Sequence, residues 1–184
     1  VIKETRRICN KVRKYSLVEV NVKSEVAVML HLLKIQENPK LLEKLVHAYA
    51  KPFIEYVEPD PEAKPLLQEL KTRGIKTGIV SNTMFSWANK KILEKHNLIQ
   101  YFDTLVFSDE VGRIKPHPQI FQQALKNLKT TPQQTIMVGD EEADIKGALN
   151  TGIKPVLIVR NKELQELENG VVIRSLREIF KLLT

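Results

Sequence analysis

From residue 62 onward, helical patterns alternate with short runs of β-branched residues, and this alternation limits the fold more than any other feature of the chain. The expected strands cover residues 75–80, 104–107, 135–138, 155–159 and 171–173. The expected helices cover residues 62–73, 86–96, 118–128 and 142–150, and a capping box of Ser175 and Glu178 opens a last helix. Because strands that alternate with helices usually pair in parallel, the pattern predicts a doubly wound α/β sheet with helices on both faces.

Residues 1–58 have a different pattern, in which apolar residues recur three and four positions apart. The pair Asn38-Pro39 is typical of a helix start within this region. A turn-rich stretch with two prolines follows at residues 58–61. We therefore expect a small α-helical domain over residues 1–58 and an α/β core over residues 59–184.

The composition excludes several classes of protein. The chain has 184 residues, 42% of them hydrophobic, which is enough to bury a core. The longest apolar run, 26–33, is interrupted by His31 and is too short to cross a bilayer, and the first residues do not resemble a signal peptide. Cys9 is the single cysteine, so we expect neither an internal disulfide nor a thiolate metal site. These features favour a cytoplasmic protein without a membrane partner.

The net charge of +7 raises the question of a nucleic-acid partner, since six basic residues gather within residues 3–14. No stacking aromatic residues and no groove-reading motif accompany them. We therefore interpret them as the solvated face of a helix and expect no nucleic acid. A positive charge also attracts small anionic substrates such as phosphate esters.

Four short segments carry the polar groups that point to chemistry. They are Ile-Val-Ser-Asn-Thr at 79–83, Lys-Pro-His-Pro at 115–118, Val-Gly-Asp at 138–140, and Asp144. Ser81 and Asp140 follow the ends of expected strands, as does Asp109, and ligands of doubly wound sheets collect at that edge. A hydroxyl, a lysine and two carboxylates together suit a phosphoryl group beside a metal ion, and carboxylates suit magnesium.

Taken one at a time, these residues have ordinary alternatives. Ser81 could occupy a turn, Lys115 could be a solvated loop residue, and Asp140 could cap the helix that begins at residue 142. Asp144 could favour the dipole of that helix. His117 stays undecided between a site residue and a loop residue. The functional interpretation depends on all of these groups meeting at one sheet edge.

With these motifs in this order, the chain resembles the haloacid dehalogenase superfamily of hydrolases, in the subfamily with a helical cap. The resemblance implies that residues 1–58 form the cap and that residues 59–184 form the core. It implies that Ser81, helped by the backbone of Asn82, binds phosphoryl oxygens and that Lys115 neutralises their charge. It further implies that Asp140 and Asp144 hold Mg²⁺ and that the substrate is a small phosphate ester.

The nucleophile of that family is an Asp in an Asp-x-Asp pair at the end of a first strand, and residues 1–184 contain no such pair before the cap helices. Asp60 and Asp103 lie outside any suitable strand end. We expect a Mg²⁺-dependent phosphatase that forms an aspartyl-phosphate, with its nucleophile outside this sequence. The missing strand would be central in the sheet, so its neighbours would expose unpaired edges. The alternatives are a 2-haloacid dehalogenase, which needs no metal, and a non-catalytic binding or scaffold protein.

Overall fold

The computed structural model describes residues 1–160, 167 and 169–183, and the chain forms two compact units. Unit 1 consists of Val1–Glu58, Ser81–Ile99 and Phe107–Ile114. Unit 2 consists of Pro59–Val80, Gln100–Val106 and Lys115–Thr184. The chain leaves unit 1 at Glu58, where the sequence suggested a boundary, and two later segments that we expected in the core belong to unit 1.

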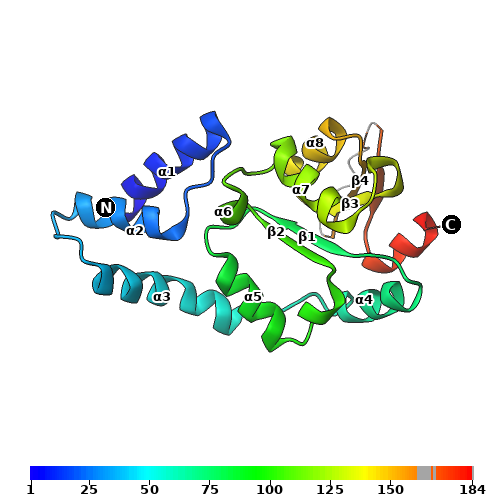
Figure 1. Ribbon diagram of the computed structural model, residues 1–184, viewed down its shortest axis with the longest axis horizontal. Coiled ribbons are helices and arrows are strands. Elements are labelled where there is room, and N and C mark those ends of the chain that lie inside the picture. The colour runs from blue at the N-terminus through cyan, green and yellow to red at the C-terminus, as the bar shows by residue number, and fades with distance from the viewer. Residues whose placement is uncertain (161–166, 168, 184) are drawn as a thin grey trace. The chain divides into compact units, whose positions relative to one another are not determined.

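Unit 1 is helical. Its helices are α1 (Ile2–Ser16), α2 (Val22–Leu32), α3 (Pro39–Tyr56), α5 (Ser86–Lys95) and the short α6 (Ser108–Val111), all visible in Figure 1. Asn38 caps α3, because its side chain accepts a hydrogen bond from the Leu41 N–H at 2.9 Å, and a proline follows at the first helical position. The helix start predicted at Asn38-Pro39 is therefore confirmed.

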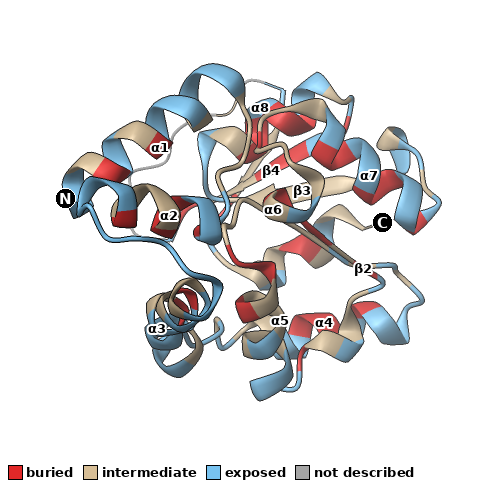
Figure 2. Ribbon diagram, turned by 60° about the vertical axis from the view of Figure 1, so that its left-hand side comes forward, coloured by how far each residue is buried: buried red, intermediate tan, exposed pale blue. Residues whose placement is uncertain are grey.

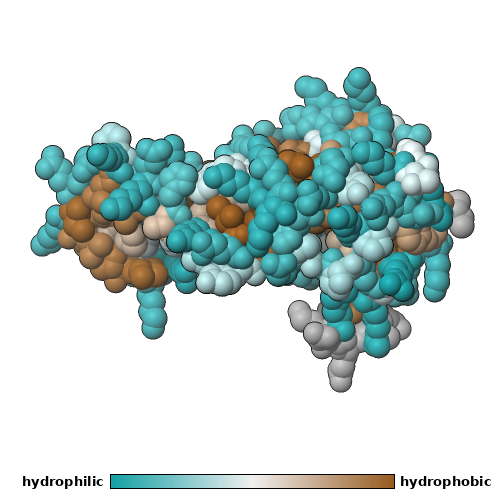
Figure 3. All heavy atoms as spheres, turned by 90° about the horizontal axis from the view of Figure 1, so that it is seen from below, coloured by the Kyte–Doolittle hydropathy of each residue, from teal (hydrophilic) through white to brown (hydrophobic). Residues whose placement is uncertain are grey.

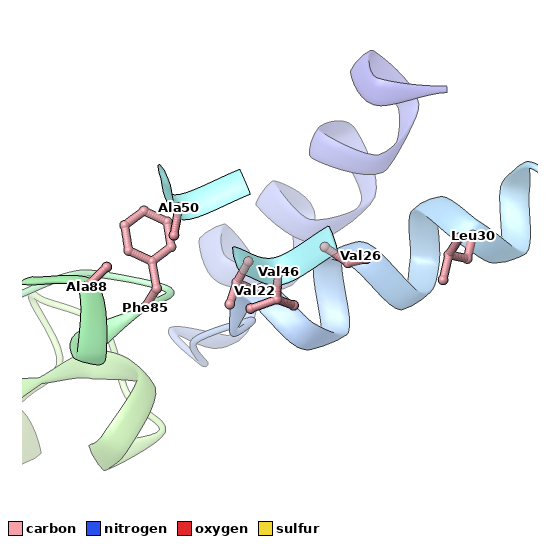
Figure 4. Close-up of a cluster of buried hydrophobic side chains, with 7 residues drawn as sticks. All are labelled: Val22, Val26, Leu30, Val46, Ala50, Phe85 and Ala88. Carbon is pink, nitrogen blue, oxygen red and sulfur yellow. The ribbon is translucent and has the colours of Figure 1, made fainter. Parts of the chain in front are cut away.

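The apolar core of unit 1 joins α2, α3 and the start of α5 (Figure 4). Its buried members are Val22, Val26, Leu30, Val46, Ala50, Phe85 and Ala88. Phe85 contributes most of the aromatic contact, with its ring centroid 4.9 Å from that of Phe53 and 6.4 Å from that of Tyr49. The segment that follows Ser81 along the chain is thus packed into the helical unit through Phe85.

A buried ion-pair group ties α1 to the linker before α2. Arg13 donates through Nε to Glu19 Oε1 at 2.8 Å and through a guanidinium nitrogen to Glu25 Oε2 at 3.3 Å. The same guanidinium donates to the Val20 carbonyl at 2.6 Å. Both carboxylates are almost fully buried, so the charge of Arg13 compensates much of the cost of burying them.

Other residues of α1 differ in their surroundings. Arg7 forms an exposed pair with Glu4, whereas the Arg13 side chain is only 16% exposed, so the basic cluster at residues 3–14 is not a uniform solvated face. Cys9 is 1% exposed, and burial raises the pKa of its thiol. A protonated, buried thiol packs as a small apolar group and is a poor metal ligand. Cys9 is therefore a buried packing residue of α1.

Unit 2 contains the α/β pattern. Its helices are α4 (Ala63–Thr72), α7 (Pro118–Leu128), α8 (Glu142–Asn150) and the 3₁₀ segments η2 (Pro132–Gln134) and η3 (Leu176–Leu182), while η1 (Ile99–Tyr101) begins in unit 1. Its strands are β1 (Gly78–Ser81), β2 (Thr104–Phe107), β3 (Ile136–Gly139), β4 (Lys154–Ile158) and β5 (Val171–Ile173). The last residues of β1 and β2 belong to unit 1.

Two expected elements differ from the prediction by more than one residue at an end or in the type of helix. β1 begins at Gly78 and not at residue 75. The Ile75 N–H donates a hydrogen bond to the Leu70 carbonyl at the end of α4, and the Thr77 N–H donates one to the Asp103 side chain, so neither N–H is available for strand pairing. The last helix is a 3₁₀ segment, although its capping box of Ser175 and Glu178 is confirmed.

The strands form two sheets in the described part of the chain. One sheet pairs β1 with β2, and the other has the order β3-β4-β5 with parallel pairing. The α/β class is therefore confirmed, but the strands do not form the single sheet that the sequence suggested. β1 and β3 are both edge strands.

Helices cover both faces of the three-stranded sheet. Ile136 and Val138 of β3 pack into a cluster with Leu66 and Leu70 of α4 and with the last 3₁₀ segment. Gly139 of β3 faces α8 instead, since a Cβ placed there would overlap its side chain at Asp144. Buried residues accordingly line the inner sides of α4, α7 and α8 (Figure 2).

The surface carries the charge. Figure 3 shows one face of the molecule, where hydrophobic patches interrupt a mostly hydrophilic surface. Exposed apolar residues include Leu33 and Ile35, which lie between α2 and α3. Across the described residues, the search for a helix with the length and apolarity needed to cross a membrane finds none.

We expect Arg13→Leu to destabilise the protein by about 3 kcal/mol, because it removes the guanidinium that pairs with two buried carboxylates. Urea unfolding followed by circular dichroism measures this change. Arg7→Leu is the matched control on the same helix, and we expect a far smaller effect because the Arg7 and Glu4 side chains are 55% and 46% exposed. Equal effects of the two substitutions would contradict the assignment of Arg13 as a buried structural cation.

Candidate functional site

A buried ion pair between Lys115 and Asp144 forms the centre of the candidate site in unit 2. Lys115 Nζ lies 2.6 Å from Asp144 Oδ1, and the two side chains are 9% and 4% exposed. The ammonium also donates to the carbonyl oxygen of Val80, at 3.1 Å. Lys115 is therefore a fixed, buried cation at the end of β1, and the alternative of a solvated loop lysine is wrong.

The segment after Lys115 has a structural role that settles the position of His117. His117 is the N-cap of α7, and its Nδ1 accepts a hydrogen bond from the Gln119 N–H at 3.2 Å. A proline at the first position of α7 favours the same start. The histidine that the sequence left undecided is a helix cap in this structure.

Asp144 holds the turn between β3 and α8 as well as the lysine. Its Oδ2 accepts a hydrogen bond from the Glu141 N–H at 3.1 Å, while the Glu141 side chain caps the helix in return. The N-cap of α8 is thus Glu141 and not Asp140. One carboxylate of α8 connects the ammonium of Lys115 to the loop that carries Asp140.

Gly139 allows this close packing. A Cβ at Gly139 would overlap the Asp144 side chain, so the Val-Gly-Asp motif needs its glycine for space. The glycine lets the first turn of α8 approach the end of β3. This steric requirement explains why the residue before Asp140 is a glycine in a strand of otherwise larger residues.

The metal ligands expected from the sequence differ in availability. Asp140 is exposed and forms no hydrogen bond or ion pair with other described residues, whereas both oxygens of Asp144 already accept hydrogen bonds. No cluster of three His, Cys, Asp or Glu side chains suited to a metal occurs among the described residues. Mg²⁺ is often held by one or two carboxylates together with waters and phosphate oxygens. The donor set here fits that kind of site, with Asp140 as the available ligand.

The expected phosphate-binding loop begins where β1 ends. Ser81 directly follows Val80 along the chain and is the first residue of this unit 1 segment. Two residues later, the Thr83 N–H donates to Ser108 Oγ at 2.8 Å, and Ser108 Oγ lies 2.5 Å from Glu19 Oε2. The loop of Ser81 and Asn82 is therefore anchored within unit 1.

The anchoring residues were not found from the sequence. Glu19 and Ser108 are 89 positions apart, and neither lies in a motif that we recognised. Asp109, which we placed at the strand ends, accepts a hydrogen bond from the Ser86 N–H at 2.8 Å and so also supports the loop. Only the fold brings these groups together.

Asp60 and Asp103, which lie outside any suitable strand end, have structural partners. Asp103 Oδ2 accepts a hydrogen bond from the Thr77 N–H at 2.8 Å. Asp60 Oδ1 accepts one from the Glu62 N–H at 2.8 Å, and its other oxygen pairs with Arg160. Both carboxylates are used to fix loops.

Comparison with known proteins places these motifs in a wider context. A family model described as haloacid dehalogenase-like hydrolase matches residues 5–158. A glyceraldehyde 3-phosphate phosphatase of Pyrococcus furiosus is 39% identical over 131 residues, covering 70% of this chain and 53% of the relative. A phosphoglycolate phosphatase of Aquifex aeolicus is 36% identical over 122 residues, covering 64% of this chain and 57% of the relative. The chain thus spans a little over half the length of these relatives.

Solved structures share the fold at lower identity. The L-2-haloacid dehalogenase of Xanthobacter autotrophicus superposes with a TM-score of 0.70 and 18% identity, covering 98% of this chain and 82% of that one. This likeness confirms the α/β fold with a helical unit. It does not discriminate between phosphatase and dehalogenase chemistry.

We expect Gly139→Ala to destabilise the protein by about 1–3 kcal/mol, because the added methyl group pushes on Asp144 and disturbs its contact with Lys115. A double-mutant cycle with Asp144→Gly tests the cause, since that change removes the atoms that the methyl group would meet. Urea unfolding of all four proteins gives the coupling energy. A cost for Gly139→Ala that is the same in both backgrounds would rule out this packing as the cause.

Proposed function

This chain belongs to the haloacid dehalogenase-like hydrolases, and we propose that the protein is a Mg²⁺-dependent phosphatase acting on a small phosphate ester through an aspartyl-phosphate. The names of the sequence relatives support a phosphate ester as substrate, although they differ in the ester. We include a cytoplasmic location in this proposal.

One observation carries the proposal, namely the fixed ammonium of Lys115 beside the loop that carries the exposed carboxylate of Asp140. A phosphoryl group in transfer spreads negative charge over its equatorial oxygens, so it requires cations that are already in place. Asp144 orients Lys115 at 2.6 Å, which keeps the cation from swinging into solvent. A lysine offers a compact charge that suits this purpose.

The remaining groups have complementary roles in the proposal. The Ser81 hydroxyl and the Asn82 backbone N–H donate hydrogen bonds to phosphoryl oxygens. Asp140 holds Mg²⁺, and Asp144 contributes mainly by positioning its neighbours. The metal supplies charge neutralisation at the phosphate when it is bound.

We further propose that the attacking carboxylate belongs to residues outside positions 1–184. Asp60 and Asp103 fix loops through hydrogen bonds. In this proposal the other groups of the site stabilise the charge of the phosphoryl group, and none of them attacks phosphorus. The partial coverage of the relatives' length supports this assignment.

A 2-haloacid dehalogenase is the second candidate. It would use the same serine and lysine without a metal, and one solved structure with this fold has that title. The acidic pair of Asp140 and Asp144 has no evident purpose in such an enzyme, which makes the phosphatase the better-supported proposal. A non-catalytic binding protein is the third outcome that experiments must separate.

We expect Asp140→Asn to lower the affinity for Mg²⁺ by about tenfold or more, because an amide brings no charge to a hard dication. Isothermal calorimetry with MgCl₂ in the presence of inorganic phosphate measures it. Glu142→Gln is the matched control, since this neighbouring carboxylate is exposed and already pairs with Lys146. Unchanged Mg²⁺ affinity in a folded Asp140→Asn protein would remove Asp140 from the metal site.

We expect residues 1–184 alone to hydrolyse p-nitrophenyl phosphate at no more than the background rate, since they lack an attacking group. A longer form of the protein that includes an Asp-x-Asp segment should hydrolyse this ester only with Mg²⁺. Turnover of 2-chloropropionate without metal would favour the dehalogenase. A longer form inactive on both substrates would favour the binding protein, and Mg²⁺-dependent turnover by residues 1–184 would refute the external nucleophile.

A further inference from the structure

Ser108, the first residue of α6, contacts two other segments of unit 1 through a single hydroxyl group. The residue is fully buried, and its Oγ lies 2.8 Å from the backbone nitrogen of Thr83 and 3.0 Å from the Thr83 carbonyl oxygen. The same Oγ lies 2.5 Å from Glu19 Oε2. A hydroxyl group has one hydrogen to donate and two lone pairs that accept. Glu19 and the Thr83 carbonyl therefore compete for that one hydrogen.

The carboxylate of Glu19 is the stronger of the two acceptors. An ionised carboxylate accepts hydrogen bonds and donates none, and an O–H···O⁻ bond is shorter and stronger than a neutral one. The distance from Ser108 Oγ to Glu19 is also the shorter of the two. The Ser108 hydrogen consequently points to Glu19, and a lone pair of Oγ accepts the Thr83 N–H. The charge of Glu19 thus sets the role of the serine toward Thr83.

Glu19 itself is fixed within the linker between α1 and α2. Its Oε1 accepts hydrogen bonds from Arg13 Nε at 2.8 Å and from the Val20 N–H at 2.9 Å. Its backbone N–H donates to the Gly112 carbonyl at 3.2 Å. The side chain is 4% exposed, so water does not replace these contacts. Because both its backbone and its side chain are bonded, Glu19 presents Oε2 to Ser108 at a defined position.

The bonded N–H of Thr83 lies close along the chain to the expected phosphate-binding residues. β1 pairs with β2 and ends at Ser81, so Asn82 is the one residue between the strand and Thr83. Further along the same loop, Asp109 accepts a hydrogen bond from the Ser86 N–H at 2.8 Å. The backbone at Ser81 and Asn82 is therefore restrained on both sides. This restraint limits the directions in which the loop can donate hydrogen bonds.

We propose that Glu19 is a positioning residue for the phosphate-binding loop that begins at Ser81, and that it acts on this loop through Ser108. The inference rests on the proposed phosphatase function, in which the loop donates hydrogen bonds to phosphoryl oxygens. Donors that are fixed before an anion binds need little rearrangement, so the affinity for phosphate depends on the contact between Glu19 and Ser108. With a neutral side chain at position 19, the Ser108 hydrogen is released to turn toward the Thr83 carbonyl.

The test uses residues 1–184 and inorganic phosphate as the probe, with isothermal calorimetry in MgCl₂ to measure the affinity. We expect Glu19→Gln to lower the affinity for phosphate by about tenfold, since a neutral hydrogen bond replaces a charge-assisted one. Ser108→Ala should lower it by a similar factor, because the Thr83 N–H then lacks its acceptor. Glu110→Gln is the matched control on α6, since this carboxylate is exposed and pairs with Lys90, and we expect unchanged affinity.

A double-mutant cycle separates positioning from a general loss of stability. If Glu19 acts through Ser108, Glu19→Gln lowers the affinity for phosphate in the unaltered chain and has no further effect in the Ser108→Ala background. Urea unfolding measures the stability of each variant separately. Amide hydrogen exchange by NMR gives a second measurement that needs no phosphate. We expect the Thr83 amide to exchange faster in Glu19→Gln, and this result keeps the test valid if Ser108→Ala does not fold.

The failure of this inference differs from the failure of the proposed function. If the unaltered chain binds no phosphate, the proposed function and this inference are overturned together. Phosphate affinity that is unchanged in Glu19→Gln would overturn this inference alone. So would an equal loss of affinity in both backgrounds of the cycle, or a Thr83 amide whose exchange does not respond to Glu19→Gln.

Discussion

The arrangement of unit 2 depends on burying two opposite charges together. Lys115 and Asp144 are both almost inaccessible to water, so each compensates the desolvation of the other. Removing one partner of such a pair typically costs about 3–5 kcal/mol, because the remaining charge stays buried. The pair also holds three backbone regions, through the Val80 carbonyl, the Glu141 N–H and the packing on Gly139. Stability and proposed chemistry therefore share the same two side chains.

Unit 1 uses the same principle for a different purpose. Arg13 compensates two buried carboxylates, and one of them, Glu19, extends the network to Ser108 and from there to the Thr83 N–H. The loop that begins at Ser81 is thus supported by groups that carry no chemistry themselves. In each unit, a buried cation fixes the backbone next to a residue with a proposed role. Such support gives a preorganised site, since its donors need little rearrangement when an anion binds.

Local signals in the sequence predicted much of this fold. The helix over 142–150, the start at Asn38-Pro39 and the capping box at Ser175 all follow from residue types within one turn, and the structure has them. The start of β1 was predicted three residues early. The reason is that the Thr77 N–H donates a hydrogen bond to the side chain of Asp103, which is distant along the chain. Non-local pairings of this kind leave no pattern in nearby residues.

In the candidate site, too, local features could be predicted from the sequence and non-local contacts could not. Its residue types and their place at strand ends could be read from the sequence, since parallel strands bring their carboxyl ends to one edge. Lys115 and Asp144 form an ion pair although they are 29 positions apart. Nothing in either motif indicates that Asp144 pairs with the lysine, when the sequence suggested it as a metal ligand. The network from Glu19 to Ser108 spans 89 positions and had no signal at all.

The division of the strands into two sheets connects the fold to the site. A strand paired with both β1 and β3 would end beside Val80 and Gly139, the two backbone positions that the Lys115 and Asp144 pair holds. Its last residue would therefore meet a cation whose position is already fixed by unit 2.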